Sequence, residues 1–268
     1  MSYEILALDL DGTLLNSQKQ ISEVAKQALI NLMKSGKKLV LASGRPTKGI
    51  SLLIEELGLK QYDSYVISYN GACVTNCRTG ETIYQKTLPQ EIIASAYDMT
   101  EQFDMDFVTY NADSIFCHQE PNEYTQIEVN AERMNLIVAQ NFVKEINFPI
   151  YKCMFVGDPA IAVEMEKALK ERYHSQYSIY GSDPYFVEIM APNTDKAQAL
   201  RYLLETIGLS QEQLICCGDS YNDIPMLKLA GLGVAMDNAP EEVKEHADYV
   251  TASNDEDGVV CVIEKFMK

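Results

Sequence analysis

The sequence predicts an α/β fold: a parallel sheet with helices on both faces, into which a second, α+β domain is inserted. Strand and helix patterns alternate over residues 3–71, become irregular in the middle of the chain, and resume near residue 194. Alternating strands and helices are the pattern of a parallel sheet. The chain has 268 residues, which favours two domains over one.

Three strands and two helices make up the first alternation. The apolar run Tyr3–Leu8 and the segments 38–42 and 65–68 have the composition of buried strands. Apolar residues recur at helical spacing in the segments between them. The expected helices extend from Ser22, a suitable N-cap, to Gly36 and from Ile50 to Gly58.

The alternation returns near the end of the chain. Thr194 is expected to cap a helix that stops at Gly208, and Pro240 to open a later helix. The remaining expected strands are 214–217, 232–236 and 248–251, and the remaining helices are 222–229 and 259–266. The expected domains are therefore a core of residues 1–83 and 189–268 and an insertion of residues 84–188.

Composition and charge exclude several classes of protein. Apolar residues make up 47% of the chain and charged residues 23%, as in soluble globular proteins. No apolar run approaches the length of a membrane span, and no signal peptide is evident. The formal net charge of −17 makes nucleic acid an unsuitable partner, because phosphate binding requires a basic face. An acidic protein still binds an anionic substrate where a metal ion or local cations reverse the charge.

The seven cysteines are scattered and odd in number, which argues against a disulfide framework. The closest spacings are the pair Cys216–Cys217 and the pair Cys73 and Cys77. No second close pair of cysteine or histidine supports a zinc site. Reduced thiols and a cytoplasmic location are expected.

Polar residues follow several of the expected strands, and they suggest a site. Asp9, Ser43, Asn70 and Asp219 each come directly after a strand. Ligands of open α/β sheets bind beyond the carboxyl ends of the strands. We therefore expect Asp9, Asp11, Asp219 and Asp223 to crowd one site. Their mutual repulsion favours a bound hard cation, and Mg²⁺ fits oxygen ligands and phosphate.

Other interpretations of these aspartates are weaker. A calcium-binding EF-hand loop that starts at Asp9 would need glycine at position six and glutamate at position twelve, where Leu14 and Gln20 stand. No Walker A phosphate loop occurs in the sequence. Asp9 and Asp11 alone are equally well explained as turn formers, and the repeated occurrence of aspartates at strand ends shifts the balance towards a site.

The segment Asp9-Leu-Asp-Gly-Thr13 resembles the first motif of the haloacid dehalogenase (HAD) superfamily. Ser43 in Leu-Ala-Ser-Gly-Arg-Pro resembles the second motif, Lys196 stands in the place of the third, and Gly218-Asp-Ser-Tyr-Asn-Asp223 resembles the fourth. The four motifs occur in the family's order. The C-terminal segments also resemble the Cof-type branch of sugar-phosphate phosphatases, whose inserted domain is a C2-type cap on a Rossmann-like core.

The resemblance implies a two-step phosphoryl transfer. Asp9 would attack phosphorus to give an aspartyl-phosphate, and Asp11 would act first as general acid and then as general base. Mg²⁺ would be held by the carboxylates of Asp9 and Asp219 and the main-chain carbonyl of Asp11. Asp223 would lie next to these ligands without binding the ion directly. The implied contacts to phosphate and substrate come from Ser43, the main-chain N–H groups of Leu10 and Gly44, and the side chains of Lys196, Asn222, Arg45 and Asn70. Arg45 would equally serve to brace its loop.

The function favoured by the sequence is a Mg²⁺-dependent phosphatase for small phosphorylated metabolites, with sugar phosphates as the expected substrates. Two alternatives stay open: a phosphomutase of the same superfamily and a catalytically idle metabolite-binding protein. The three histidines, His118, His174 and His246, lie outside every motif, so surface or core roles are expected for them. The physiological substrate and the oligomeric state do not follow from the sequence.

Overall fold

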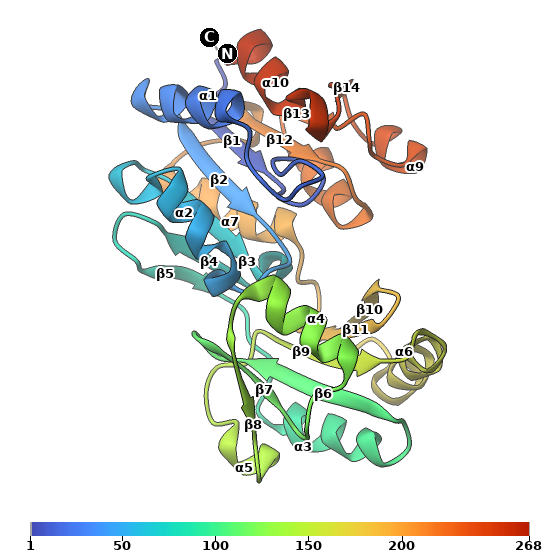
Figure 1. The fold of residues 1–268 in the computed structure, drawn as a ribbon. Coiled ribbons are helices and arrows are strands. Elements are labelled where there is room, and N and C mark those ends of the chain that lie inside the picture. Colours follow the sequence, from blue (N-terminus) through green and yellow to red (C-terminus); the bar gives the residue numbers. More distant parts are fainter. Residues whose placement is uncertain (1, 268) are drawn as a thin grey trace. The chain divides into compact units, whose positions relative to one another are not determined.

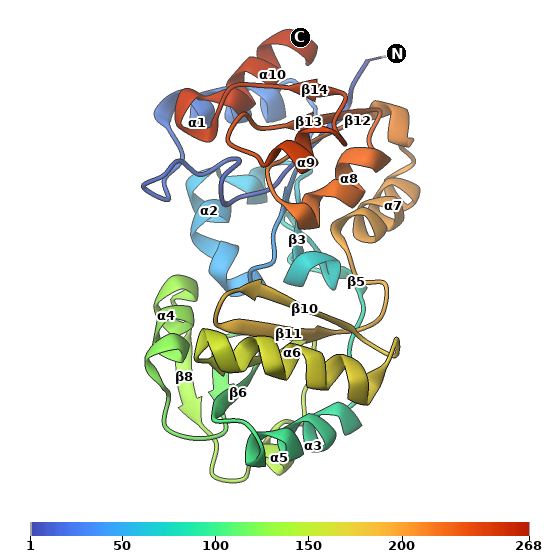
Figure 2. The same ribbon diagram turned by 90° about the vertical axis from the view of Figure 1, so that its right-hand side faces the viewer.

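The computed structural model describes residues 2–267, which form two compact units. The first unit comprises residues 2–44, 50–84 and 195–267, and the second comprises residues 45–49 and 85–194. Figures 1 and 2 show the elements of each unit. The chain returns to the first unit later than the expected boundary at residue 188, because the strand Phe186–Met190 still pairs within the second unit.

An eight-stranded sheet forms the centre of the first unit. Its strands are β1 (Ile5–Leu8), β2 (Lys38–Ala42), β3 (Tyr65–Ser68), β4 (Cys73–Asn76), β5 (Thr82–Gln85), β12 (Leu214–Gly218), β13 (Leu232–Ala235) and β14 (Tyr249–Val250). They follow the order β14-β13-β12-β1-β2-β3-β4-β5. From β14 to β3 all neighbouring strands are parallel, which confirms the expected sheet.

Helices cover both faces of this sheet (Figure 1). They are α1 (Glu23–Lys34), α2 (Ser51–Glu56), α7 (Lys196–Ile207), α8 (Ile224–Leu229), α9 (Glu241–Lys244) and α10 (Gly258–Phe266). Because side chains alternate along a strand, Leu6 and Leu8 of β1 pack in one core with residues of α1, α2 and α10. Ile5 and Ala7 pack in the other core with residues of α7 and α8. The sheet is thus buried on both faces, as a parallel sheet requires.

Short polar side chains set where two of these helices begin. Ser22 caps α1, as expected, by accepting a hydrogen bond from a main-chain N–H of the first turn. The expected cap of α7 at Thr194 is wrong, because Asp195 is the N-cap and its carboxylate binds the first turn. Thr194 instead donates its hydroxyl to the carbonyl of Ala191. Lys196 is therefore the first residue of α7.

The second unit is built on a six-stranded, mainly antiparallel sheet. Its strands are β6 (Met105–Tyr110), β7 (Ser114–Cys117), β8 (Asn135–Val138), β9 (Lys152–Gly157), β10 (Ser178–Asp183) and β11 (Phe186–Met190), in the order β10-β11-β9-β6-β7-β8. Its helices are α3 (Glu91–Tyr97), α4 (Glu123–Glu132), α5 (Phe142–Glu145) and α6 (Pro159–Tyr173). Residues of α3, α5 and α6 form one apolar core with the sheet. The expected α+β insertion is confirmed.

Buried charged and polar groups lie between α4 and the neighbouring strands of this sheet. The Nζ of Lys152 lies 3.0 Å from the Oε1 of Glu188, and both side chains are almost fully buried. The hydroxyl of Tyr180 donates to the Oε2 of Glu188, and that of Tyr110 donates to Glu128 of α4. Burial alone would lower the pKa of Lys152, but the neighbouring glutamates, Glu188 first, raise it. The second unit therefore retains an ionised pair inside its fold.

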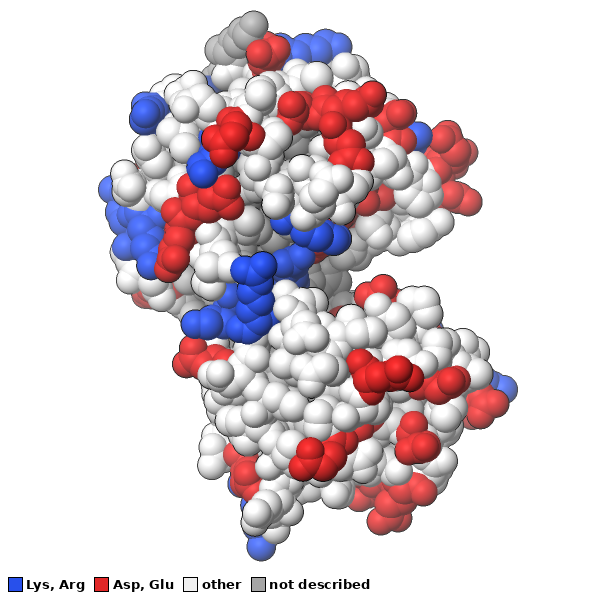
Figure 3. All heavy atoms as spheres, viewed as in Figure 1, with Lys and Arg blue, Asp and Glu red and all other residues white. Residues whose placement is uncertain are grey.

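Acidic side chains are spread over the surfaces of both units (Figure 3), in keeping with the net charge of −17. Among residues 2–267, no helix combines the length and the apolar character needed to cross a membrane.

The buried pair gives a prediction about stability. Glu188→Gln is expected to lower the free energy of unfolding by about 3–5 kcal/mol, because it leaves the Lys152 ammonium buried without its charged partner. Urea denaturation followed by circular dichroism measures the change. The control is Lys167→Met, which removes an exposed pair with Glu171 and should cost less than about 0.5 kcal/mol. Equal effects of the two substitutions would contradict the prediction.

Candidate active site

The carboxyl edge of the parallel sheet brings the strand-end residues of the first unit together. Leu8 of β1 lies opposite Leu41 of β2 on one side and Cys217 of β12 on the other. Asp9, the next residue after β1, extends this pairing, because its N–H donates to the carbonyl of Cys217 at 3.0 Å. Ser43 follows β2 in the same way and donates its N–H to Ile67 of β3.

A buried lysine joins two of the aspartates. The Nζ of Lys196 lies 2.6 Å from the Oδ1 of Asp9 and 2.7 Å from the Oδ1 of Asp223. Lys196 and Asp223 are fully buried and Asp9 is 7% exposed. Burial alone would lower the pKa of Lys196, but Asp223 and then Asp9 raise it, so the ammonium stays charged. This ion pair connects the start of α7 with the ends of β1 and β12.

The three carboxylates of Asp9, Asp219 and Asp223 each offer an oxygen within 4.8 Å of the others. Burial, followed by the negative charge of Asp223, raises the pKa of Asp9 well above its usual range. Burial also raises the pKa of Asp219, to about 6. When all three carboxylates are ionised, the one ammonium leaves an excess of two negative charges, so the donor set fits a divalent cation with oxygen ligands.

Gly12 and Thr13 fix the position of Asp219. The hydroxyl of Thr13 donates to the Oδ1 of Asp219 at 2.9 Å. Gly12 has a φ of +86°, and a Cβ at this position would lie 2.3 Å from the Oδ2 of Asp219. The turn after β1 therefore approaches Asp219 so closely that it requires glycine.

Hydrogen bonds to Asp223 explain why it faces Lys196 rather than an open site. Its Oδ1 accepts from Lys196, and its Oδ2 accepts from the main-chain N–H groups of Asp219 and Ser220 at 3.1 and 3.0 Å. Each oxygen thus has a donor within the protein. Asp223 therefore orients Lys196 and the loop of Asp219.

Two asparagines meet next to the Ser43 turn. Asn70 has a φ of +51° and donates its N–H to the carbonyl of Ser43 at 2.9 Å. The side-chain amide of Asn222 donates to the Oδ1 of Asn70 at 3.2 Å. A Cβ on Gly71 would lie 2.2 Å from the carbonyl oxygen of Asp195, so this turn packs directly on the start of α7. The first unit thereby brings Ser43, Asn70 and Asn222 into one group.

Asp11 departs from the expected cluster. Its Oδ1 lies 2.8 Å from the Nζ of Lys19, and its carboxylate does not join the group formed by Asp9, Asp219 and Asp223. The expectation that all four carboxylates crowd one point is wrong for its side chain. The cause is the turn at Gly12, after which the chain forms a loop that carries Lys19 back to Asp11.

The remaining predicted residues are placed as follows. Leu10 is fully buried, and its carbonyl accepts from the N–H groups of Thr13 and Leu15. Gly44 ends the first segment of the first unit, and Arg45 begins the first segment of the second unit.

Three contacts of the site were missed by sequence reasoning. They are the Thr13 bond to Asp219, the Lys19 pair with Asp11, and the bond from the side-chain amide of Asn238 to the carbonyl of Gly12 at 2.8 Å. Thr13 stands inside the first motif, so the motif was an available signal for it. Lys19 and Asn238 are ordinary loop residues in the sequence, and only the fold brings them to the site.

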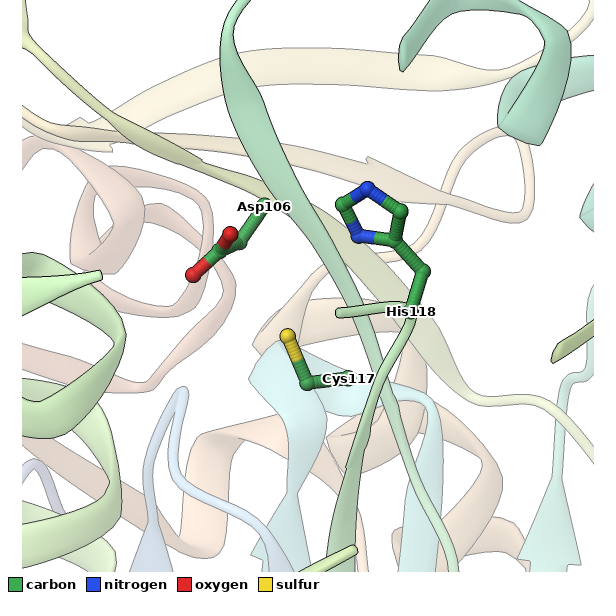
Figure 4. A group of neighbouring side chains, drawn as sticks. All are labelled: Asp106, Cys117 and His118. Carbon is green, nitrogen blue, oxygen red and sulfur yellow. The ribbon is translucent and has the colours of Figure 1, made fainter. Parts of the chain in front are cut away.

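A second group of potential ligands, Asp106, Cys117 and His118, lies in the second unit around β6 (Figure 4). The Nδ1 of His118 already accepts from the N–H of Phe107 at 3.0 Å. Asp106 accepts from Gln119, Asn122 and Thr125. Burial raises the pKa of the Cys117 thiol to about 12. These groups take part in the hydrogen bonding of the unit's fold, and the raised pKa of Cys117 disfavours the thiolate that a metal ion would need.

Comparison with known proteins agrees with the fold and the site. Residues 6–263 match the family of haloacid dehalogenase-like hydrolases. The chain is 32% identical to the putative phosphatase YxeH of Bacillus subtilis, over 99% of this chain and 98% of that protein. The crystal structure of a haloacid dehalogenase-like hydrolase from Bacteroides thetaiotaomicron superposes with a TM-score of 0.95 and 40% identity, covering 98% of this chain and 99% of the other.

The sugar phosphatase BT4131, of HAD subclass IIB, superposes with a TM-score of 0.83 and 29% identity over 98% of each chain. The fold and the strand-end carboxylates thus define a hydrolase of the haloacid dehalogenase type. The chain belongs to the haloacid dehalogenase-like hydrolase family. Within that family it is an enzyme of the phosphatase class.

The close approach of Gly12 to Asp219 gives a prediction. Gly12→Ala is expected to weaken binding of a divalent cation at least about tenfold in titration calorimetry with Mg²⁺ as the probe, because the new methyl group displaces the Asp219 carboxylate. Gly36→Ala is the matched control, since Gly36 has a similar φ of +92° and no atom near the added Cβ. If both substitutions weaken binding equally, backbone strain rather than contact with Asp219 is responsible.

Burial of Cys117 gives a second prediction. The pKa of its thiol is about 12, so a solution at pH 8 is about four units below it. Roughly one molecule in ten thousand then carries the reactive thiolate. Iodoacetamide is therefore expected to label Cys261, which is exposed, and to leave Cys117 unlabelled until the protein is denatured. Mass spectrometry of the digested protein reads the result, and rapid labelling of Cys117 in the native protein would contradict it.

Proposed function

We propose that this enzyme is a Mg²⁺-dependent phosphatase that hydrolyses phosphate monoesters of small metabolites, above all sugar phosphates. The observation that carries the proposal is the buried arrangement of Asp9, Lys196 and Asp223 beside Asp219 at the carboxyl edge of the sheet. It combines a carboxylate nucleophile, a fixed cation and a set of oxygen ligands. A phosphate dianion needs all three if it is to be attacked by another anion.

Two aspartates of the first unit, Asp9 and Asp11, carry out the chemical steps in this proposal. Asp9 attacks phosphorus, and the bond from phosphorus to the leaving oxygen breaks to give an aspartyl-phosphate. Asp11 protonates the leaving oxygen and then takes a proton from the water that attacks the aspartyl-phosphate. The second step releases inorganic phosphate and restores both carboxyl groups.

Phosphate binding follows from the groups around Asp9. Lys196, held 2.6 Å from Asp9, offsets the repulsion between the nucleophile and the phosphate. Ser43 and the main-chain N–H groups of Leu10 and Gly44 are suited to hold phosphate oxygens. Asn222 and Asn70 are hydrogen-bonded to each other through their side chains, and they place one further amide near the Ser43 turn. Arg45 is proposed to contact the leaving group or to brace its loop.

The carboxylates of Asp9 and Asp219 and the main-chain carbonyl of Asp11 would hold Mg²⁺, which supplies charge neutralisation to the phosphate when bound. Thr13 and Asp223 keep these ligands in place through their hydrogen bonds. The excess negative charge of the site and the raised pKa of Asp219 fit this assignment. The protein's own part is to fix the ligands in a largely buried site.

The two units take different parts in the proposal. The first unit would form the catalytic core, and the second unit would act as a C2-type cap that selects the leaving group and limits access of water. The named substrate class of BT4131 supports sugar phosphates as the first compounds to test. A reducing compartment such as the cytoplasm suits the seven free cysteines.

A substrate panel tests the proposal. Phosphate release from sugar phosphates and from p-nitrophenyl phosphate is expected to require Mg²⁺ and to stop with a chelator. Asp9→Asn should lower kcat by at least about three orders of magnitude, because it removes the nucleophile. Asp63→Asn, which changes an exposed carboxylate of the same unit, should leave kcat unchanged.

Product analysis distinguishes the alternatives. Formation of an isomeric sugar phosphate without release of inorganic phosphate would indicate a mutase. Binding of metabolites without turnover, by a folded protein that also binds Mg²⁺, would indicate a metabolite-binding protein. Either result would contradict the phosphatase proposal.

A further inference from the structure

Lys19 forms an ion pair with Asp11 that none of the four motifs explains. The Nζ of Lys19 lies 2.8 Å from the Oδ1 of Asp11. The side chains are 64% and 36% exposed, so water screens the pair and it adds little to the stability of the fold. A contribution to stability therefore does not account for this contact.

The loop around Lys19 is tightly organised. The side-chain oxygen of Asn16 accepts from the N–H groups of Gln18 and Gln20, and the N–H of Lys19 donates to the carbonyl of Asn16. Lys19 itself has a φ of +59°, a conformation that residues other than glycine rarely adopt. The fold thus holds this lysine in an uncommon backbone conformation, which is typical of positions with a functional task.

Residues from the end of the chain fasten the same loop. The side-chain amide of Asn254 donates to the carbonyl of Leu15 at 2.8 Å, and the N–H of Ser17 donates to Asp255 at 2.7 Å. The loop is therefore anchored at Leu15 and Ser17, shortly before Lys19. These hydrogen bonds hold the backbone that carries Lys19 close to Asp11.

The two carboxylates of the first motif are held by different lysines. Asp9 pairs with Lys196 from α7, whereas Asp11 pairs with Lys19 from the loop. In phosphoryl transfer the attacking and leaving oxygens lie on opposite sides of phosphorus. A general acid must therefore stand apart from the nucleophile. The Lys19 ammonium draws the Asp11 carboxylate to its own side, away from the group of Asp9, Asp219 and Asp223.

We propose that Lys19 is a positioning residue that holds the Asp11 carboxylate apart from Asp9, Asp219 and Asp223, where it serves the leaving oxygen. The inference rests on the proposed function, in which Asp11 is the general acid. It predicts that Lys19 matters most when the leaving group needs a proton. Nitrophenolate is a weak base and leaves without one, whereas phenolate is a much stronger base and benefits from protonation.

The test compares kcat/KM for phenyl phosphate and p-nitrophenyl phosphate, because kcat/KM reports the step that releases the leaving group and not the later hydrolysis of the aspartyl-phosphate. Lys19→Asn tolerates a positive φ and lacks the ammonium, so it removes the charge while keeping the loop. It is expected to lower kcat/KM for phenyl phosphate about tenfold, a part of the usual effect of a general acid. The change for p-nitrophenyl phosphate should be less than about twofold. Lys19→Arg should restore most of the loss.

Two reference variants make the result unambiguous. Asp11→Asn should show the same dependence on the leaving group with a larger amplitude. Lys26→Met removes another surface ion pair of the first unit and should affect neither ester. Equal losses of kcat/KM for both esters in Lys19→Asn, no loss for either, or a gain would overturn the positioning role while Asp11→Asn keeps its pattern. If Asp11→Asn itself shows no dependence on the leaving group, the proposed function fails instead.

Discussion

The buried ammonium of Lys196 is the interaction on which the rest of the site depends. It lies between Asp9 and Asp223 with no exposure to solvent, so it must be paired within the protein. Its position is set by Asp195, which caps α7 and makes Lys196 the first helical residue. The end of β1, the start of α7 and the loop after β12 are therefore tied to a single charged group. A shift of any one of them would leave a charge buried and unpaired.

The parallel sheet could be predicted from the sequence because its signals are local. The segments 38–42 and 65–68 are strands as expected, and Ser22 caps the first helix. The sheet then places the residues after its strands at one edge, so the proximity of Asp9 and Asp219 follows from topology alone. Lys196 became a candidate only through the resemblance of the motifs, since a lysine in a first helical turn has no signal of its own.

The remaining contacts depend on positions that no local pattern encodes. Asn70 meets Asn222 across 152 positions of sequence, and Asn238 reaches Gly12 across 226. Asp195 and not Thr194 caps α7, because the Thr194 hydroxyl already donates to the carbonyl of Ala191. The strand Phe186–Met190 belongs to the second unit because it pairs with β9, which lies about 30 residues earlier in the chain. This pairing moves the end of the second unit beyond the expected residue 188. Asp11 stands apart from the carboxylate group because the turn at Gly12 leads into a loop that brings Lys19, eight residues away, to its side chain.

Charge explains how so acidic a chain can receive an anionic group. Over the whole molecule the field repels phosphate, but screening by salt confines this effect to short range. Inside the first unit the decisive charges lie within a few ångströms, where Lys196 is desolvated and cannot be screened. Asp223 and Asp9 raise the pKa of Lys196, and together with Asp219 they form a carboxylate group that a further cation would neutralise, which would favour phosphate in turn. The acidity of this site is thus the reason that it can bind an anion, provided that a divalent metal completes it.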